Sequence, residues 1–241
     1  MLFKIQNWKL ALLSLIFISL FTGLGFWQLN RGREKQAIIA EFQQRTSQPP
    51  YSVTDLRTPR DWRFYTVELK GKFDNKHTIL LDNKIFNGKI GYEVYTPFKA
   101  DKFDEPILID RGFIPLGVSR NALPAVPKAT SESVQISGML NLPPRYMSYG
   151  QMVESSKIQW PLRVEYINLG EISSILNEKL FPYVITLDPA SKNALQVKWQ
   201  VVVGQPNKHT GYAVQWFALA ATLLIISIAL NRTPRKKKGR K

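Results

Sequence analysis

One stretch near the C-terminus restricts what this chain can fold into more than any other. No lysine, arginine, aspartate or glutamate occurs from His209 to Asn231. A helix of about 20 apolar residues is long enough to cross the ~30 Å hydrocarbon core of a bilayer. Seven of the ten residues that follow, 232–241, are lysine or arginine. The pattern predicts a transmembrane helix over 209–230 and a basic tail over 231–241.

A second uncharged run, residues 10–30, lies close to the N-terminus after the short segment 1–9. A secretory signal peptide has a shorter apolar core and a small-residue cleavage site, and neither is recognisable here. Trp8 and Trp27 stand near the two ends of the run, as interfacial aromatic residues do. These features predict an uncleaved transmembrane helix, so residues 31–208 form one region between two membrane crossings.

The charges beside the second helix set the expected orientation, because basic residues are retained on the cytoplasmic side. A single lysine, Lys208, immediately precedes this helix, whereas seven basic residues follow it. Both termini are therefore expected in the cytoplasm, with residues 31–208 in the periplasm or, in a mitochondrion, the intermembrane space. No Arg- and Ser-rich amphipathic presequence precedes the first helix, which favours a bacterial inner membrane over a mitochondrial one.

The net charge of +15 is compatible with nucleic acid or with an anionic membrane surface as a partner. Much of the excess lies beside the second membrane helix, which favours membrane lipid over nucleic acid. The chain has no cysteine, so disulfides, thiolate zinc sites, iron–sulfur ligation and a cysteine nucleophile are excluded. It also lacks a G-x-S-x-G elbow, a phosphate-binding glycine loop and an H-E-x-x-H pair. We therefore expect no enzyme; the alternative, a membrane-anchored hydrolase, would have to use carboxylates alone.

The region between the crossings begins as a helix and continues as strands. Residues 31–48 show partial helical periodicity up to Pro49-Pro50 and extend the first membrane helix outward. Residues 51–62 are polar and form a connecting loop. Short alternating segments separated by turns then predict strands at residues 63–73, 77–86, 89–98, 106–114, 133–142, 158–169, 183–187 and 197–203. Asn87-Gly88 is a hairpin signal, and 170–180 is a short amphipathic helix.

This order predicts a β-rich domain outside the cytoplasm, an antiparallel barrel or sandwich with one or two short helices, bracketed by two transmembrane helices. Asp82, Asp110 and Arg111 lie inside the strand patterns. We expect them to form buried pairs that fix the sheet, the alternative being contact with a partner. His77, at the start of a strand, is expected to be a lone exposed histidine.

Six segments occur in the order found in one known family. They are Gly25–Arg31 with Lys35, Gly71–Asp74, Leu80–Asn83, Gly91–Pro97, Asp110–Pro115 and Asn207–Phe217. In these segments the chain resembles the SURF1 (Surfeit locus protein 1) cytochrome c oxidase assembly factors, whose motifs include G-x-W-Q-x-x-R, L-L-D-N-R and N-x-H-x-x-Y-A-x-[QT]-W-F. Lys84 and Phe113 stand where the family usually has arginine and tryptophan.

The resemblance implies a membrane protein that helps to build haem–copper cytochrome c oxidase and acts when haem a is placed into subunit I. It implies cytochrome c oxidase subunit I and other oxidase assembly factors as partners. Two mechanisms are compatible with it. The protein either binds haem a at the outer membrane face, or it is a non-haem-binding scaffold that stabilises subunit I.

His209 is the candidate ligand for haem iron, because a neutral imidazole is a good axial ligand. Tyr212 and Trp216 follow it at helical spacing and share its face, so they are expected to form aromatic walls. The alternative is a histidine and aromatic belt at the membrane interface that caps the helix. A scaffold has no chemical need for an imidazole at this position, so His209 discriminates between the two mechanisms.

Trp27 and Arg31 lie four residues apart at the outer end of the first helix and share a face. Arg31 is expected to pair with a haem propionate or another carboxylate, and Trp27 to pack on the porphyrin or on the second helix. The alternative is an interfacial tryptophan and a snorkelling arginine. Gly23 and Gly25 are expected to let the two helices approach closely, unless they are ordinary membrane-helix glycines.

Overall fold

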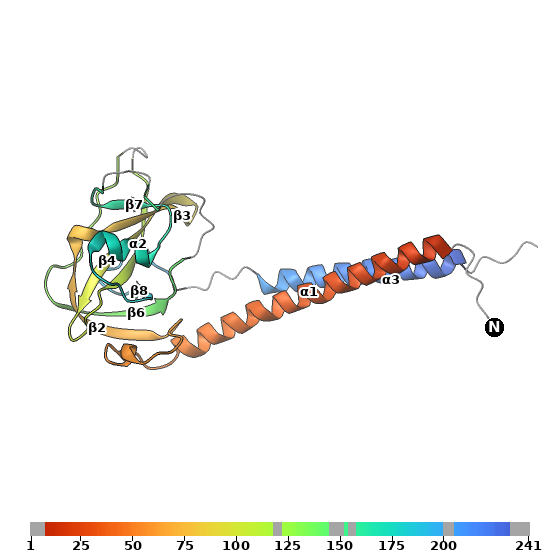
Figure 1. Cartoon of the computed structure of the whole chain (residues 1–241), viewed down its shortest axis with the longest axis horizontal. Coiled ribbons are helices and arrows are strands. Elements are labelled where there is room, and N and C mark those ends of the chain that lie inside the picture. Colours follow the sequence, from red (N-terminus) through yellow and green to blue (C-terminus); the bar gives the residue numbers. More distant parts are fainter. Residues whose placement is uncertain (1–7, 118–121, 145–151, 154–157, 200–204, 232–241) are drawn as a thin grey trace, which may run out of the picture. The chain divides into compact units, whose positions relative to one another are not determined.

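The computed structural model describes residues 8–117, 122–144, 152–153, 158–199 and 205–231 (Figure 1). Two compact units make up the chain. The first, the helix pair, comprises Met1–Glu41 and Val201–Lys241, and the second, the β-rich unit, comprises Phe42–Gln200. The predicted tail 231–241 and segment 1–9 lie almost wholly outside the described residues, and their placement stays a prediction.

Helix α1, Trp8–Thr46, and helix α3, Pro206–Asn231, are the two long apolar helices. By length and composition both are able to cross a membrane. As expected, α1 runs on past the first apolar run, and it ends before Pro49-Pro50, where proline offers no backbone N–H to continue a helix. Two apolar helices thus flank a β-rich unit along the chain, and this part of the predicted fold is confirmed.

The two helices run antiparallel and pack through a regular line of positions, which we call the helix seam (Figure 1). Seam positions recur at alternating steps of three and four residues, the 3.5-residue spacing of left-handed coiled-coil packing. They are Ser14, Ile18, Phe21, Gly25, Gln28 and Gly32 on α1, and Pro206, His209, Ala213, Trp216, Ala220 and Leu223 on α3. The buried members are serine, glycine or alanine, and such small residues let the two backbones approach closely.

The β-rich unit is built on one sheet of eight strands among its described residues. Its strands are β1 Tyr51–Ser52, β2 Thr66–Phe73, β3 Ile79–Phe86, β4 Lys89–Ala100, β5 Ile107–Pro115, β6 Val134–Asn141, β7 Leu162–Val164 and β8 Val184–Leu187. The order across the sheet is β1-β2-β6-β8-β5-β4-β3-β7. Two 3₁₀ turns, η1 Asp55–Arg57 and η2 Asn75–His77, and one short helix, α2 Leu169–Leu176, complete the described elements.

Strand β2 has different partners along its length. Residues 66–71 pair with β6, and residues 71–73 pair with β4. Because β6, β8, β5 and β4 are neighbours in turn, this double pairing joins five strands into a closed circuit. Gly71 is paired on both sides, with Val134 of β6 and Ala100 of β4.

The expected antiparallel arrangement is found for most of the strand pairings, but not for all of them. Five of the eight strand pairings among the described residues are antiparallel, but β1–β2, β3–β7 and β5–β8 are parallel. Each parallel neighbour is a short strand of two to four residues that is joined to a longer one. The loop expected over 51–62 contains two unpredicted elements, β1 and η1.

The strands expected over 63–73, 77–86, 89–98, 106–114, 133–142 and 183–187 match β2 to β6 and β8, whereas only Leu162–Val164 of the strand expected over 158–169 is formed. The hairpin signal Asn87-Gly88 connects β3 and β4, with φ of 49° and 76°, values that favour asparagine and glycine. The last expected strand, 197–203, is not formed at 197–199, and the rest of it lies outside the described residues. Only Gln196 makes an isolated bridge, to Phe113. Helix α2 ends earlier than expected, at Asn177, which adopts the left-handed conformation.

The core of the unit consists of three groups of buried apolar side chains. The largest lies between β2, β5, β6 and β8 and includes Trp62 and Phe98. A second group, around Tyr95 and Leu108, is covered by α2 through Ile172. The third, around Tyr92, lies beneath Leu116 and Val126. Alternation along each strand places these residues on buried faces.

Asp110 is a buried carboxyl that accepts hydrogen bonds from two neutral groups. Its Oδ1 accepts from the backbone N–H of Gly112 at 2.9 Å, and its Oδ2 accepts from the Thr186 hydroxyl at 3.1 Å. Burial, followed by repulsion from Glu93, raises the pKa of Asp110 well above its usual value. The two donated hydrogen bonds favour the charged carboxylate, but burial outweighs them, so the raised pKa favours a protonated Asp110 at this point of β5.

Arg111 is the next residue, and it does not pair with Asp110. It is the extra residue of a β-bulge, because Asp110 faces Tyr95 while Gly112 faces Val94. Although only 2% exposed, it donates from Nε to the carbonyl of Asn193 at 2.9 Å. It also donates from a terminal nitrogen to the carbonyl of Pro127 at 2.8 Å. Burial lowers the pKa of Arg111 to about 10, so it remains charged at neutral pH.

The expected pairing of buried charges is therefore wrong for these two residues, which use neutral partners instead. Arg111 is the unpaired residue of the bulge, and its guanidinium reaches backbone carbonyls outside β5, while Asp110 accepts from Gly112 and Thr186. Asp82 differs, because it lies 4.0 Å from Nε of Arg163.

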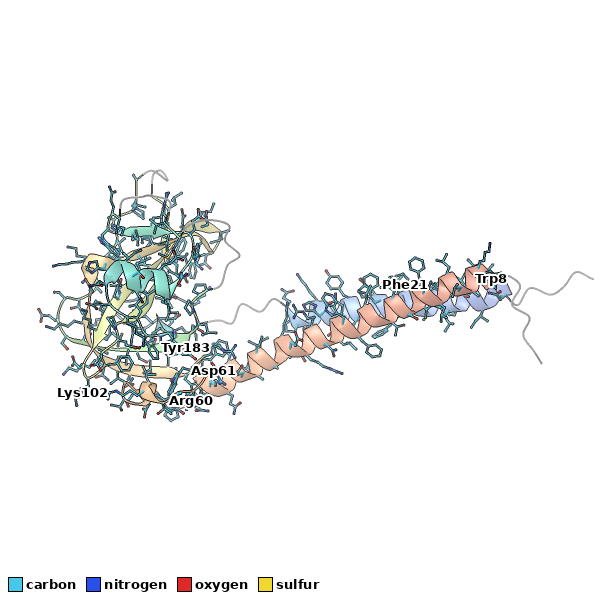
Figure 2. All side chains as sticks on the ribbon, viewed as in Figure 1. Trp8, Phe21, Arg60, Asp61, Lys102 and Tyr183 are labelled. Atoms are coloured by element: carbon cyan, nitrogen blue, oxygen red, sulfur yellow. The ribbon has the colours of Figure 1, made fainter. Side chains whose placement is uncertain are left out.

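The last turn of α1 is part of the β-rich unit. Arg45 donates to Oδ2 of Asp61 at 3.1 Å and to the carbonyl of Arg63 at 3.0 Å. Burial opposes ionisation of Asp61, but hydrogen bonds from Arg63 and Arg45 outweigh it and lower the pKa of Asp61 to about 2. The adjacent Arg60 carbonyl accepts from the Tyr183 hydroxyl at 3.3 Å, in the cluster labelled in Figure 2. These contacts fix the end of α1 to the sheet.

Candidate functional site

The site begins with a hydrogen bond between the two helices of the helix pair. Nδ1 of His209 lies 2.6 Å from Oε1 of Gln28. An amide oxygen can only accept, so Nδ1 carries the hydrogen and donates it. In the neutral ring this tautomer leaves a lone pair on the other nitrogen, Nε2. A histidine held in this way has the protonation state and the fixed ring that a metal ligand needs.

Close packing brings these two side chains together. A Cβ atom added at Gly32 would lie 3.5 Å from Cβ of His209 and 3.6 Å from the carbonyl of Pro206. About two turns further along α1, a Cβ at Gly25 would lie 2.6 Å from the ring of Phe217. Glycine at these two seam positions leaves room for the first turns of α3.

The two predicted aromatic residues of α3 are placed differently from each other. Trp216 is half-buried, and its ring centre lies 5.6 Å from that of Phe21 on α1. Tyr212 is 48% exposed and lies one turn from His209 on the same helix. Tyr212 is thus available to a flat ligand beside the imidazole, whereas Trp216 contributes to the packing between the helices.

The two predicted residues of α1 lie on the surface of the helix pair. Arg31 forms an ion pair with Glu34 at 2.8 Å, and both side chains are more than half exposed. Such exposed pairs contribute about 0–1 kcal/mol, so Arg31 can exchange Glu34 for another carboxylate at little cost. Trp27 is 53% exposed, next to Gln28. The structure therefore brings His209 together with Gln28, and it brings Trp216 together with Phe21 about two helical turns away. Trp27, Tyr212 and Arg31 make no hydrogen bond or ring contact to His209 in the described part of the chain.

Gln28 is the site residue that sequence reasoning did not select. It is one of few uncharged hydrogen-bonding side chains at the end of the first apolar run. The second apolar run begins with a histidine, His209. Polar groups in apolar surroundings need partners, and this requirement is the signal that pairs the two residues.

His77, expected to be a lone exposed residue, is neither lone nor fully exposed. Nδ1 of His77 lies 2.6 Å from Oδ2 of Asp74, and its ring centre is 4.7 Å from that of Trp160. Its side chain is 39% exposed. The prediction failed because a histidine in a turn can bond to the residue three positions earlier, which periodicity does not reveal.

The packing at the helix seam predicts different effects of substitution at two nearby glycines. Gly25→Leu places a side chain where Phe217 lies, whereas Gly23→Leu enters open space, since nothing lies within 4 Å of its Cβ position. We expect Gly25→Leu to weaken the association of the two helices by about 1–3 kcal/mol and Gly23→Leu to leave it unchanged. Disulfide formation between cysteines introduced together at Phe21 and Trp216 measures the association. Equal losses in both variants would contradict the seam.

Comparison with known proteins places the chain among named relatives. The model of the SURF1 family matches residues 15–221. A SURF1-like protein of Rickettsia felis is 26% identical over 230 residues, which cover 93% of this chain and 97% of the relative. Surfeit locus protein 1 of Xenopus tropicalis is 26% identical over 229 residues, covering 87% and 71%. A shorter match, 33% identical over 94 residues and covering 38% and 24%, is to the cytochrome oxidase assembly protein SHY1 of Saccharomyces cerevisiae.

Proposed function

This chain belongs to the SURF1 family, and from that premise we propose that it is a membrane-anchored assembly factor for cytochrome oxidase. The family match spans most of the chain, including both site segments around Gln28 and His209. The yeast relative is named as a cytochrome oxidase assembly protein. The two apolar helices support a place in the membrane. The role is that of a helper protein, not of an enzyme.

We propose further that the helix pair binds haem a through His209 during insertion into subunit I. The observation that carries this proposal is the 2.6 Å hydrogen bond from His209 Nδ1 to Gln28 Oε1, because it leaves Nε2 as a ligand atom. When bound, haem a would supply an iron that accepts a nitrogen ligand. His209 provides this nitrogen, and Gln28 holds its ring orientation and tautomer.

The surrounding residues have supporting roles in this proposal. The exposed ring of Tyr212 would pack against the ligand, and the Trp216–Phe21 pair would hold the two helices together beside the site. Arg31 exchanges its weak surface partner Glu34 for a propionate, which suits the planar guanidinium. The exposed indole of Trp27 anchors α1 at the membrane interface.

The cellular arrangement is part of the proposal. The chain spans a bacterial inner membrane twice, with cytoplasmic termini and the β-rich unit in the periplasm. The argument for this orientation is the set of seven basic residues that follow α3. The β-rich unit docks on subunit I and on other assembly factors. The mitochondrial inner membrane is the alternative location.

Complementation of a strain that lacks the gene tests this function. The parent chain should restore oxidase activity and the haem a content of the membranes. His209→Ala should leave both at the level of the deletion strain, and Gln28→Ala should give partial restoration because the ring loses only its orienting partner. Thr210→Ala, at an exposed neighbouring position of α3, is the matched control. Full restoration by His209→Ala at equal protein abundance would contradict haem binding and support the alternative, a scaffold that never binds haem. Failure of the parent chain would refute the assembly role itself.

A further inference from the structure

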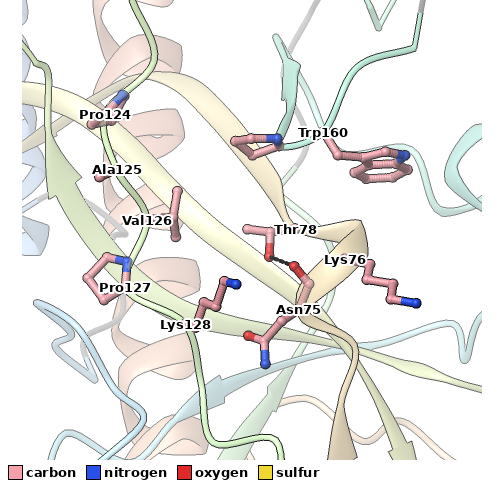
Figure 3. Close-up of a pocket in the computed structure, with 10 residues that line it drawn as sticks. Asn75, Lys76, Thr78, Pro124, Ala125, Val126, Pro127, Lys128 and Trp160 are labelled. Carbon is pink, nitrogen blue, oxygen red and sulfur yellow. Dashed lines mark hydrogen bonds between the residues drawn. The ribbon is translucent and has the colours of Figure 1, made fainter.

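The β-rich unit contains a cleft of about 240 Å³, which we call the lysine pocket (Figure 3). Its walls come from three segments: the turn around Lys76, the extended stretch Pro124–Lys128 and the pair Trp160-Pro161. Six of its ten lining residues are apolar, and three of those are prolines. The pocket belongs to this unit alone and uses none of the helix-pair residues.

Two polar side chains hold the extended wall in place. The amide of Asn75 donates to the carbonyl of Ala129 and accepts from its N–H, both at 2.9 Å. The buried guanidinium of Arg111 donates to the carbonyl of Pro127 at 2.8 Å. Proline also has a restricted backbone, so this wall is formed in advance of any binding.

Two successive side-chain contacts fix the opposite wall. Asp74 accepts from Nδ1 of His77, whose ring packs nearly perpendicular to Trp160 at 4.7 Å. The oriented histidine thereby positions the indole at the edge of the pocket. His77 and Asp74 thus have a structural role. Their contacts leave the indole surface available to a ligand.

The charge at the pocket is positive. Lys76 and Lys128 both line it and are exposed, and neither forms an ion pair within the part of the chain that the structure describes. The neighbouring carboxylate, Asp74, is already bonded to His77. Two ammonium groups on either side of an apolar, aromatic surface fit a carboxylate-bearing chain with an apolar residue beside the charge. Figure 3 shows Lys128 next to Pro127, with Lys76 on the turn that carries Asn75.

We propose that the lysine pocket is a docking site for an acidic, extended segment of a partner protein. Its volume supports a peptide occupant, because small-molecule sites typically occupy about 300–1,000 Å³ and this pocket is smaller. Grooves with aromatic side chains are a common surface for extended peptides, and Trp160 provides such a side chain here. The apolar majority of the lining argues against a lipid headgroup, for which lysines alone suffice.

Binding of labelled peptides to the full chain in detergent tests the proposal. The probe is a short fluorescein-labelled peptide with a Glu-Leu-Glu core, compared with the same peptide carrying Gln-Leu-Gln. We expect the acidic peptide to bind, with an affinity that falls as salt is added, and the neutral peptide to bind at least about tenfold more weakly. The double variant Lys76→Glu with Lys128→Glu should bind the acidic peptide at least about tenfold more weakly than the parent does. Trp160→Ala should weaken the binding of both peptides.

The matched control is Lys70→Glu with Lys102→Glu, which reverses two exposed charges away from the pocket and should leave affinity unchanged. The proposal is overturned if no acidic peptide binds, if the neutral peptide binds equally well, or if the control variant loses as much affinity as the pocket variant. Displacement of the peptide by phosphatidylglycerol added to the micelles would assign the pocket to lipid and also overturn it. None of these outcomes depends on haem a or on His209, so each is distinguishable from failure of the assembly role.

Discussion

Gly71→Ala should lower the thermal midpoint of the β-rich unit by about 6–12 °C, corresponding to a loss of about 3 kcal/mol or more. A Cβ atom at this position would lie 2.1 Å from the carbonyl oxygen of Lys99 and 2.8 Å from Cα of Ala100. Both obstacles are backbone atoms, which cannot rotate away as the end of a side chain can. The methyl group therefore has to push β4 away from β2.

The location of Gly71 explains why the effect should be large. It is the residue at which β2 passes from pairing with β6 to pairing with β4, so its displacement opens the closed circuit of five strands. Glycine is favoured at such points because another backbone approaches closely. Thermal unfolding of the full chain, followed by near-ultraviolet circular dichroism, measures the effect.

Gly117→Ala is the matched control for this variant. Its nearest contact would be 3.5 Å, which is ordinary van der Waals distance. We expect its midpoint to lie within about 2 °C of the parent. A normal midpoint for Gly71→Ala would mean that β2 and β4 do not meet as described.

Arg111→Met should destabilise the β-rich unit by about 2–3 kcal/mol. Methionine keeps most of the volume of the side chain but leaves the carbonyls of Asn193 and Pro127 without their donor. The loss is limited because the variant no longer has to bury a charge, a cost visible in the lowered pKa of Arg111. Thermal unfolding of the full chain again provides the measurement.

Arg57→Met is the control for Arg111→Met. Arg57 is exposed and makes one described hydrogen bond, to the carbonyl of Lys102 at 2.8 Å. Removing it should cost no more than about 0.5 kcal/mol. Since Arg111 also holds Pro127, the Arg111 variant should bind the acidic peptide more weakly than Arg57→Met does. Equal stability of the two variants would contradict the role given to the buried guanidinium.

Local patterns were sufficient to predict the helices and most strands. The uncharged runs define α1 and α3, and Pro49-Pro50 ends α1, because length and backbone chemistry decide these features without tertiary contacts. Asn87-Gly88 predicts its hairpin for a similar reason, since its dihedral angles suit these two residue types. The family resemblance drawn from ordered motifs is also confirmed.

Strand pairing could not be read in the same way. A strand shows the same alternation whether its neighbour is parallel or antiparallel, so the parallel neighbours of β2, β3 and β5 leave no mark in the sequence. Residues 197–199 have a strand-like composition but form no strand, and the backbone hydrogen bonds to β5 come from the preceding residues Leu195 and Gln196. In these cases strand formation and strand direction depend on partners that are far away in the sequence.

The candidate site was predictable in part. His209 and Trp216 share a helix face by spacing alone, and the structure places both in the helix seam. The pairing of His209 with Gln28 depends on the relative register of two helices that are far apart in sequence, which no local pattern contains. The neutral partners of Asp110 and Arg111 likewise depend on a bulge that periodicity does not reveal.

The most direct test of the central claim is the visible absorption spectrum of the full chain purified from cells that make haem a. The parent should carry a haem a spectrum, because Nε2 of His209 is available as a ligand while Nδ1 is held by Gln28. His209→Ala should lose or shift that spectrum, and Thr210→Ala should keep it. A parent that is folded and binds its oxidase partner but shows no haem a absorption would contradict the claim, as would an unchanged spectrum in His209→Ala.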